Sequence, residues 1–236
     1  AFFTHVSHEL RTPVTLIINP IRQLLLEKKG SDQETLQVIF RNSKRLLSMV
    51  DQLLLFKKAD SHNDSLKIAR LNVDEICKEV YQCYQLHAAH QRIDFKFITT
   101  NESQEIYVDR EKIEIILFNL LANAFKFTPI GGRIELKVIC DRERVHILVE
   151  DTGTGVADEL KDTLFDKFAR NVQPKQAGFG IGLFLSKKFA ELHQGTLTFK
   201  NKETGGAVFT LSLLAGKEHW ADRLIYEDIN SKSIFL

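Results

Sequence analysis

Two consecutive stretches of the sequence repeat their apolar residues at alternating intervals of three and four. The first runs from the start of the chain to about Lys28, and the second follows the stop signal at Gly30. This is the spacing of a coiled-coil seam and predicts two amphipathic helices in a hairpin. Two helices cannot enclose such a seam, so we expect two hairpins to pair as a four-helix bundle in a homodimer. The seam residues are Phe3, Val6, Leu10, Ile17 and Leu24, then Leu36, Ile39, Leu46, Val50 and Leu53.

The first predicted helix carries a histidine and a glutamate on the side that faces away from the seam. With Phe3 at seam position a, His8 falls at the outward position f. A neutral imidazole there keeps one ring nitrogen able to attack an electrophile, and Glu9 could accept a proton from the other nitrogen. Pro13 is expected to bend the helix, because it crowds the carbonyl group of Glu9. Taken alone, the pair favours the simpler interpretation of a solvated helix face. The exposed His5, without these neighbours, is assigned no chemistry.

The composition is that of a soluble globular protein, with 44% hydrophobic and 27% charged residues in 236. A net charge of +1 gives no support for a nucleic-acid partner or for membrane contact driven by bulk charge. No apolar run reaches the roughly 18 residues that span a bilayer. Cys77, Cys83 and Cys140 lack metal-type spacing, and an odd number of thiols suits a reducing compartment, so we expect a cytoplasmic chain. Because it opens inside a helix at Ala1, we expect a piece of a longer protein.

A polar segment at 61–65 separates the helical pattern from a second unit, in which strand and helix signals alternate. Most of the predicted strands come in hairpin pairs with helices between them, which indicates a two-layer α/β sandwich with a mixed sheet. The predicted strands are 66–73, 93–99, 133–140, 144–150, 196–200 and 207–214, and the predicted helices are 74–90, 109–125 and 181–193.

The helix predicted over 109–125 ends in a motif with two amides on one face. Asn119 and Asn123 are four residues apart, and Lys126 follows Asn123 by about one turn. An amide oxygen is a suitable ligand for magnesium, and an ammonium group can neutralise phosphate charge. An amphipathic helix with polar surface amides is the alternative interpretation of this motif.

A second motif begins where a buried strand ends. The strand delivers Asp151 into a turn that contains Gly153 and Gly155. A carboxylate in this position can accept a hydrogen bond from a purine amino group, while bare backbone packs against the ring. An ordinary turn would explain the same residues.

The third motif is rich in glycine and opens the helix predicted over 181–193. Its glycines would let backbone N–H groups approach phosphate oxygens at a helix N-terminus. It does not follow a strand in a βαβ unit, which argues against a dinucleotide fold. The polar stretch 171–177 before it has the character of a mobile lid. The motif comprises Gly178, Gly180, Gly182 and Leu183.

Together and in this order, the motifs resemble those of sensor histidine kinases. The segment 8–13 resembles the H box, the three later motifs resemble the N, G1 and G2 boxes, and 165–170 is similar to the F box, although Ala169 stands where an aromatic residue is common. The resemblance implies a multi-domain α and α+β protein. Its dimerisation and histidine phosphotransfer domain would be 1–62, its catalytic domain of the Bergerat ATP-binding type 66–214, and its linker or tail 215–236.

The resemblance also implies roles for single residues. His8 matches the phosphoacceptor, Asn123 the magnesium ligand and Asp151 the adenine contact. Thr12 resembles the position that orients water when the partner regulator is dephosphorylated. The remaining residues of the implied ATP site are Asn119, Lys126, Gly153, Gly155, Phe168, Arg170, Gly178, Gly180, Gly182 and Leu183.

The function implied by the resemblance is ATP- and Mg²⁺-dependent autophosphorylation of His8, followed by transfer to an aspartate of a response-regulator receiver domain. The residues of the H-box and N-box motifs are similar to those of hybrid sensors, in which a receiver follows the kinase core. The fragment would derive from a membrane-bound sensor. Two alternatives stay open. An ATPase of the same nucleotide-binding fold is disfavoured, because such relatives place a glutamate base where this chain has Asn119. A pseudokinase acting as a dimeric scaffold would bind little ATP.

Overall fold

The computed structural model describes residues 15, 17–19, 21–22, 36–37, 39–40, 43, 66–100, 105–167 and 181–220. The chain divides into two compact units, Ala1–Asp64 and Ser65–Leu236. Within the described ranges, none of the helices is long and apolar enough to cross a membrane.

In the first unit, every described residue is helical, in agreement with the two predicted helices. The guanidinium of Arg22 lies 5.8 Å from the centroid of the Phe40 ring and joins one helix to the other. Ile18 is buried, although the predicted seam runs through its neighbour Ile17, which is 50% exposed. The predicted seam and the face buried in one chain therefore differ here. The other seam residues, apart from Leu36 and the 42% exposed Ile39, lie outside the described residues.

The second unit contains a five-stranded sheet in the order β2-β4-β5-β7-β6 and a two-stranded sheet of β1 and β3. Strands β2 and β4 are parallel, and all other pairs are antiparallel. The elements are β1 (Ala69–Asn72), α3 (Val73–Gln91), β2 (Asp94–Thr99), β3 (Glu105–Val108), α4 (Arg110–Phe127), β4 (Arg133–Cys140), β5 (Arg144–Asp151), the 3-10 helix η1 (Asp158–Leu160), α5 (Gly182–Leu192), β6 (Thr196–Asn201) and β7 (Ala207–Leu214).

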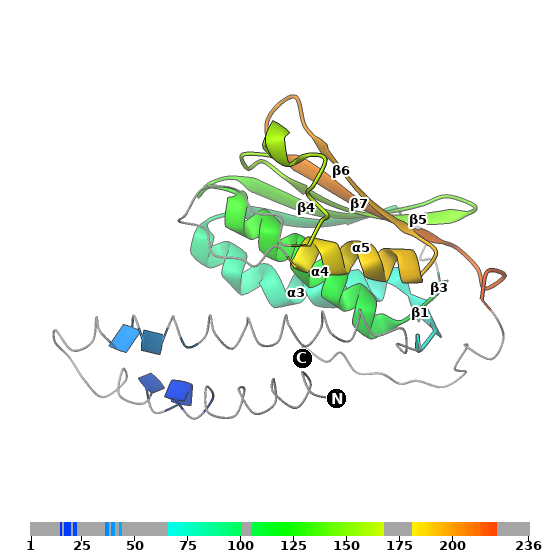
Figure 1. The fold of residues 1–236 in the computed structure, drawn as a ribbon, viewed down its shortest axis with the longest axis horizontal. Coiled ribbons are helices and arrows are strands. Elements are labelled where there is room, and N and C mark those ends of the chain that lie inside the picture. Colours follow the sequence, from blue (N-terminus) through cyan, green and yellow to red (C-terminus); the bar gives the residue numbers. More distant parts are fainter. Residues whose placement is uncertain are drawn as a thin grey trace. The chain divides into compact units, whose positions relative to one another are not determined.

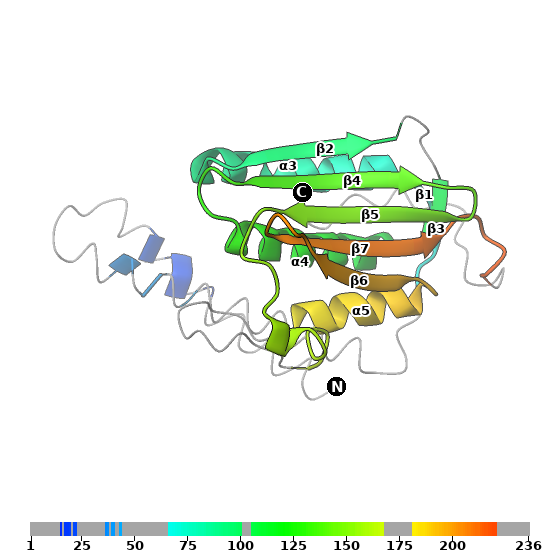
Figure 2. The same cartoon turned by 90° about the horizontal axis from the view of Figure 1, so that it is seen from above.

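The helices α3, α4 and α5 cover one face of the five-stranded sheet (Figures 1 and 2). Strands β4 and β5 alternate between fully buried and partly exposed residues, because successive side chains point to opposite faces. Ile134 and Leu136 on β4 and Ile147 on β5 are completely buried in the core between the layers. The predicted two-layer α/β sandwich with a mixed sheet is confirmed.

The first predicted strand of this unit is wrong in its extent, and one strand was missed. Residue 73 begins helix α3, because the Asn72 side chain caps the helix by accepting hydrogen bonds from the N–H groups of Asp74, at 2.9 Å, and Glu75, at 3.3 Å. The short strand β1 that precedes it pairs with β3, which was not predicted. The four residues of β3 are too few to show a clear alternation.

The segment after β7 is packed onto the start of the second unit. Trp220 is buried against Leu66 and Ile68, with Tyr107 beside them. Its indole N–H donates a hydrogen bond of 2.8 Å to the Tyr107 carbonyl oxygen. The first residues of the expected tail, 215–220, therefore continue the fold of this unit, and 221–236 lie outside the described residues.

Candidate nucleotide-binding site

The Asp151 carboxylate is buried at the end of β5, with 5% of the residue exposed. Its Oδ1 accepts hydrogen bonds from the backbone N–H of Gly153, at 2.7 Å, and of Ala207, at 3.3 Å. Within the described residues, the other oxygen, Oδ2, has no hydrogen bond. Burial raises the pKa of this carboxyl group, and the two N–H donors and the ammonium of Lys202 oppose the shift only in part. One oxygen is therefore fixed by the fold, and the second can accept a hydrogen bond from a ligand.

The turn after Asp151 contains glycines where a side chain would not fit. A Cβ on Gly153 would lie 2.6 Å from the carbonyl oxygen of Phe127, at the end of α4. Gly155 has a φ of +69°, and a Cβ there would lie 3.1 Å from Oδ1 of Asn201. The turn thus packs its bare backbone against two neighbouring elements of the protein, and the packing of this backbone against a purine ring stays a prediction.

The turn between β6 and β7 contacts both the backbone and the side chain of Asp151. The sequence analysis did not predict this contact. A Cβ on Gly206 would clash with the Asp151 carbonyl oxygen, and the next residue, Ala207, supplies the N–H that holds the carboxylate. The ammonium of Lys202 donates to the same Asp151 carbonyl oxygen at 3.3 Å. The paired glycines of this turn were the only local signal in the sequence.

The first amide of the predicted helix motif joins it to the glycine-rich motif. The Asn119 side-chain NH₂ group lies 3.4 Å from the carbonyl oxygen of Gly182 and 3.4 Å from the hydroxyl oxygen of Ser186. A Cβ on Gly182 would lie 3.1 Å from Asn119 Oδ1, so the glycine permits this close approach. Two motifs that are 63 residues apart therefore meet at the first turn of α5, which begins at Gly182 and Leu183.

The second amide, Asn123, is half-buried one turn further along α4. Its side chain has no hydrogen bond within the described part of the chain, and an amide oxygen is a suitable ligand for Mg²⁺. Lys126 is exposed, its ammonium lies 4.9 Å from the centroid of the Phe127 ring, and partial burial lowers its pKa. These two residues fit a magnesium ion and a phosphate group on the same side of the helix.

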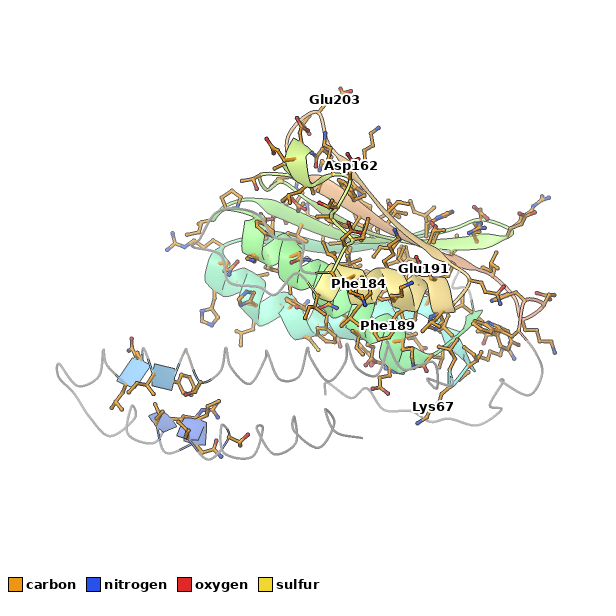
Figure 3. All side chains as sticks on the ribbon, in the orientation of Figure 1. Lys67, Asp162, Phe184, Phe189, Glu191 and Glu203 are labelled. Atoms are coloured by element: carbon orange, nitrogen blue, oxygen red, sulfur yellow. The ribbon has the colours of Figure 1, made fainter. Side chains whose placement is uncertain are left out.

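The segment that precedes the predicted lid is anchored by aromatic rings. Phe165 packs edge-on against Phe199 of β6, with 6.0 Å between centroids. The ammonium of Lys187 lies 5.3 Å from the Phe165 centroid, and that of Lys167 lies 5.1 Å from the centroid of Phe184. Figure 3 shows Phe184 on α5. Lysine-to-ring contacts therefore cross between this segment and α5 in both directions. The predicted lid, 171–177, lies outside the described residues.

Several predicted site residues lie outside the described part of the chain. They are His8, Glu9 and Thr12 in the first unit and Phe168, Arg170, Gly178 and Gly180 in the second. The described ones, Asn119, Asn123, Lys126, Asp151, Gly153, Gly155, Gly182 and Leu183, all come from the second unit. Among these, the contacts above join Asn119 to Gly182 and Asp151 to Gly153.

Comparison with known proteins identifies the class of both units. Residues 1–62 match the His Kinase A (phospho-acceptor) domain, and residues 108–217 match the histidine kinase-, DNA gyrase B-, and HSP90-like ATPase family. "Histidine kinase P4" of Formosa agariphila is 37% identical over 235 residues, which is 96% of this chain and 17% of that protein. "Hybrid signal transduction histidine kinase D" of Dictyostelium discoideum is 34% identical over 90% of this chain and 14% of that protein.

The fold leads to the same class. The crystal structure of histidine kinase ThkA in complex with response regulator protein TrrA has a TM-score of 0.66 and 25% identity, over 92% of this chain and 62% of that one. The chain belongs to the histidine kinases. It combines a phospho-acceptor domain with a domain of the ATPase family, and it spans less than a fifth of the length of the two relatives named above.

Proposed function

We propose that the chain phosphorylates itself on His8 from MgATP and passes the phosphoryl group to an aspartate of a receiver domain. The observation that carries the proposal is the Asp151 carboxylate, buried with Oδ1 held by two backbone N–H groups and Oδ2 able to accept a hydrogen bond. The amino group of adenine would donate to Oδ2. The contact between Asn119 and Gly182 supports a phosphate-binding end built from α4 and the start of α5.

Each residue of the proposed site has a distinct task. Asn123 would hold magnesium, which neutralises phosphate charge when bound, and Lys126 would add a second positive group. A nitrogen of the His8 imidazole would form a bond to the γ-phosphorus as the bond to the ADP oxygen breaks, and Glu9 would take up the proton from the other ring nitrogen. Phe168 and Arg170 would contribute to the site from the segment just before the lid, and Gly178, Gly180, Gly182 and Leu183 would form the phosphate-binding turn.

The proposal extends to partners and to the setting of the fragment. Exposed Ile17 and Ile39 on the predicted seam support a homodimer, because a second hairpin would cover them. The relatives named as histidine kinases and the ThkA–TrrA complex support a receiver domain as the second partner. We place the chain in the cytoplasm as part of a membrane-bound sensor, with phosphatase activity toward the receiver assigned to Thr12.

Labelling with γ-³²P-ATP tests the proposed reaction. The wild-type chain should acquire label that is labile in acid and stable in base, as expected for phosphohistidine. His8→Gln and Asp151→Ala should each abolish the label, whereas His5→Gln should retain it. Label that survives His8→Gln would contradict the assignment of His8. Release of phosphate without protein labelling would instead indicate an ATPase.

A further inference from the structure

Asn201, the last residue of β6, makes two hydrogen bonds to the backbone of one residue, Val156, in the turn that follows Asp151. Its Oδ1 accepts from the Val156 N–H at 2.9 Å, and its side-chain NH₂ group donates to the Val156 carbonyl oxygen at 2.7 Å. The side-chain amide therefore pairs with Val156 as a backbone peptide would in a β-bridge. The two residues are 45 positions apart, so no local pattern indicates the contact.

The opposite end of the same turn is held by the strand partner of Asn201. Within the β6–β7 hairpin, Asn201 pairs with Ala207. The N–H of Ala207 donates to Oδ1 of Asp151 at 3.3 Å. One cross-strand pair thus fixes the turn where it begins, at Asp151, and where it ends, at Val156.

Between Asp151 and Val156, the turn also contacts the β6–β7 hairpin at Gly155. A Cβ on Gly155 would lie 3.1 Å from Oδ1 of Asn201 and 3.2 Å from the carbonyl oxygen of Gly206. Thr152 and Thr154, in contrast, are exposed. A loop that is fixed at both ends loses less conformational freedom when a ligand binds, which increases affinity without a new ligand contact.

We propose that Asn201 is a positioning residue of the nucleotide site, acting through Val156 on the turn that packs against the base. This inference rests on the proposed binding of ATP through Asp151. Asn201 would hold the turn in its binding conformation and fix the point at which the chain leaves it toward η1. Because the turn serves the base end of the ligand, the effect is the same for ATP, ADP and adenosine.

Calorimetric titration of the full chain with MgATP, ADP and adenosine tests this role. In Asn201→Ala both hydrogen bonds are lost, and in Asn201→Asp an oxygen replaces the donor and faces the Val156 carbonyl group. We expect both variants to bind all three ligands more weakly by a similar factor, on the order of tenfold, because two neutral hydrogen bonds that hold the turn are lost or disrupted. The KM for ATP in autophosphorylation should rise, whereas kcat at saturating ATP should stay near the wild-type value. Lys200→Ala, which alters an exposed residue of the same strand, is the matched control.

The outcomes separate this inference from the proposed function. If the wild-type chain binds none of the three ligands, the proposed function fails, and the role of Asn201 fails with it. If the wild-type chain binds them and both Asn201 variants bind equally well, only the role of Asn201 is overturned. A loss confined to MgATP, or an equal loss in Lys200→Ala, would also overturn it. If Asn201→Ala does not fold, Asn201→Asp, which keeps the size and the acceptor, decides.

Discussion

The Nε2 atom of His193 accepts a hydrogen bond of 3.0 Å from the backbone N–H of Asp109. His193 is the C-cap of α5 and Asp109 is the N-cap of α4, so the contact joins the end of one helix to the start of the other. The Asn119–Gly182 contact lies further along the pair, toward the candidate site. Figure 3 shows Lys67, whose N–H donates to Asp109 Oδ2, far from Glu203 in the β6–β7 turn, which contacts Asp151. The antiparallel packing of α4 and α5 brings Asn119 and Gly182 together near the candidate site. The His193–Asp109 hydrogen bond holds the same two helices together at their other end.

This contact predicts that acid weakens the fold. A backbone N–H can only donate, so the proton of the neutral ring is on Nδ1, which donates to the Phe189 carbonyl oxygen at 2.6 Å. Burial lowers the pKa of His193 below its ordinary 6.5. At pH values between the lowered pKa of the folded chain and 6.5, His193 is more protonated in the unfolded chain than in the folded one. The free energy of unfolding therefore falls as the pH drops below 6.5, by at most about 1.4 kcal/mol per pH unit for this one site. Urea unfolding between pH 5 and pH 8 measures the slope.

His193→Gln should be less stable at pH 8 and should lose part of that slope. His219, whose pKa burial also lowers, acts in the same direction, whereas the raised pKa of Asp151 acts in the opposite one at lower pH. His90→Gln changes an exposed histidine on α3 and should keep the wild-type slope. An unchanged slope in His193→Gln would contradict the role assigned to this ring.

Asp151→Asn should separate binding from stability. The amide can still accept from Gly153 and Ala207, but its NH₂ group would face the donor of the ligand. A lost hydrogen bond to a charged group, about 1.5–3 kcal/mol, predicts roughly 10- to 100-fold weaker ATP binding. Because burial disfavours the carboxylate, the ligand-free variant should melt at the wild-type temperature or above. Asp141→Asn, at an exposed carboxylate that accepts two backbone N–H groups, should instead leave ATP binding intact. Equal ATP affinity in Asp151→Asn would refute the adenine contact.

The adjacent glycines of the β6–β7 turn provide a matched pair. Gly205 and Gly206 have φ values of +90° and +87°, so alanine strains the backbone equally at both, by about 1–3 kcal/mol. Only at Gly206 does the added Cβ clash with the Asp151 carbonyl oxygen. Thermal unfolding and calorimetry should show a larger loss of stability and of ATP affinity in Gly206→Ala than in Gly205→Ala. Similar losses in the two variants would argue against the tight packing of the turn on Asp151.

Thr128 offers a test of stability next to the site. Its hydroxyl oxygen is the one buried side-chain polar atom without a hydrogen-bond partner among the described residues. Thr128→Val keeps the shape and removes that atom, so the free energy of unfolding should rise by about 1–3 kcal/mol. Thr152→Val should lower it, because the Thr152 hydroxyl accepts from the Arg133 N–H at 2.9 Å. Denaturant unfolding of both variants should give shifts of opposite sign. A destabilised Thr128→Val would show that the hydroxyl is paired in solution.

The sequence predicted the elements of the second unit whose pattern is long enough to read. Helices α3, α4 and α5 and the hairpins β4–β5 and β6–β7 lie within two residues of their predicted bounds. Asp151, Gly153 and Asn119 were also indicated by local motifs, since their residue types follow a strand end or a helix face. The short strand β3 could not be predicted from its four residues, and its partner β1 is separated from it in the sequence by α3 and β2.

The apolar periodicity and the ordered motifs by themselves determined the class of the fold and predicted the chemistry of the candidate site, because both depend on spacings of a few residues. Only the tertiary structure decided which residues hold that site in place. Ala207 meets Asp151 from 56 positions away, Asn201 meets Val156 from 45, and His193 meets Asp109 from 84. Such partners are selected by strand pairing and helix packing, and those long-range contacts leave no periodic trace in the chain itself.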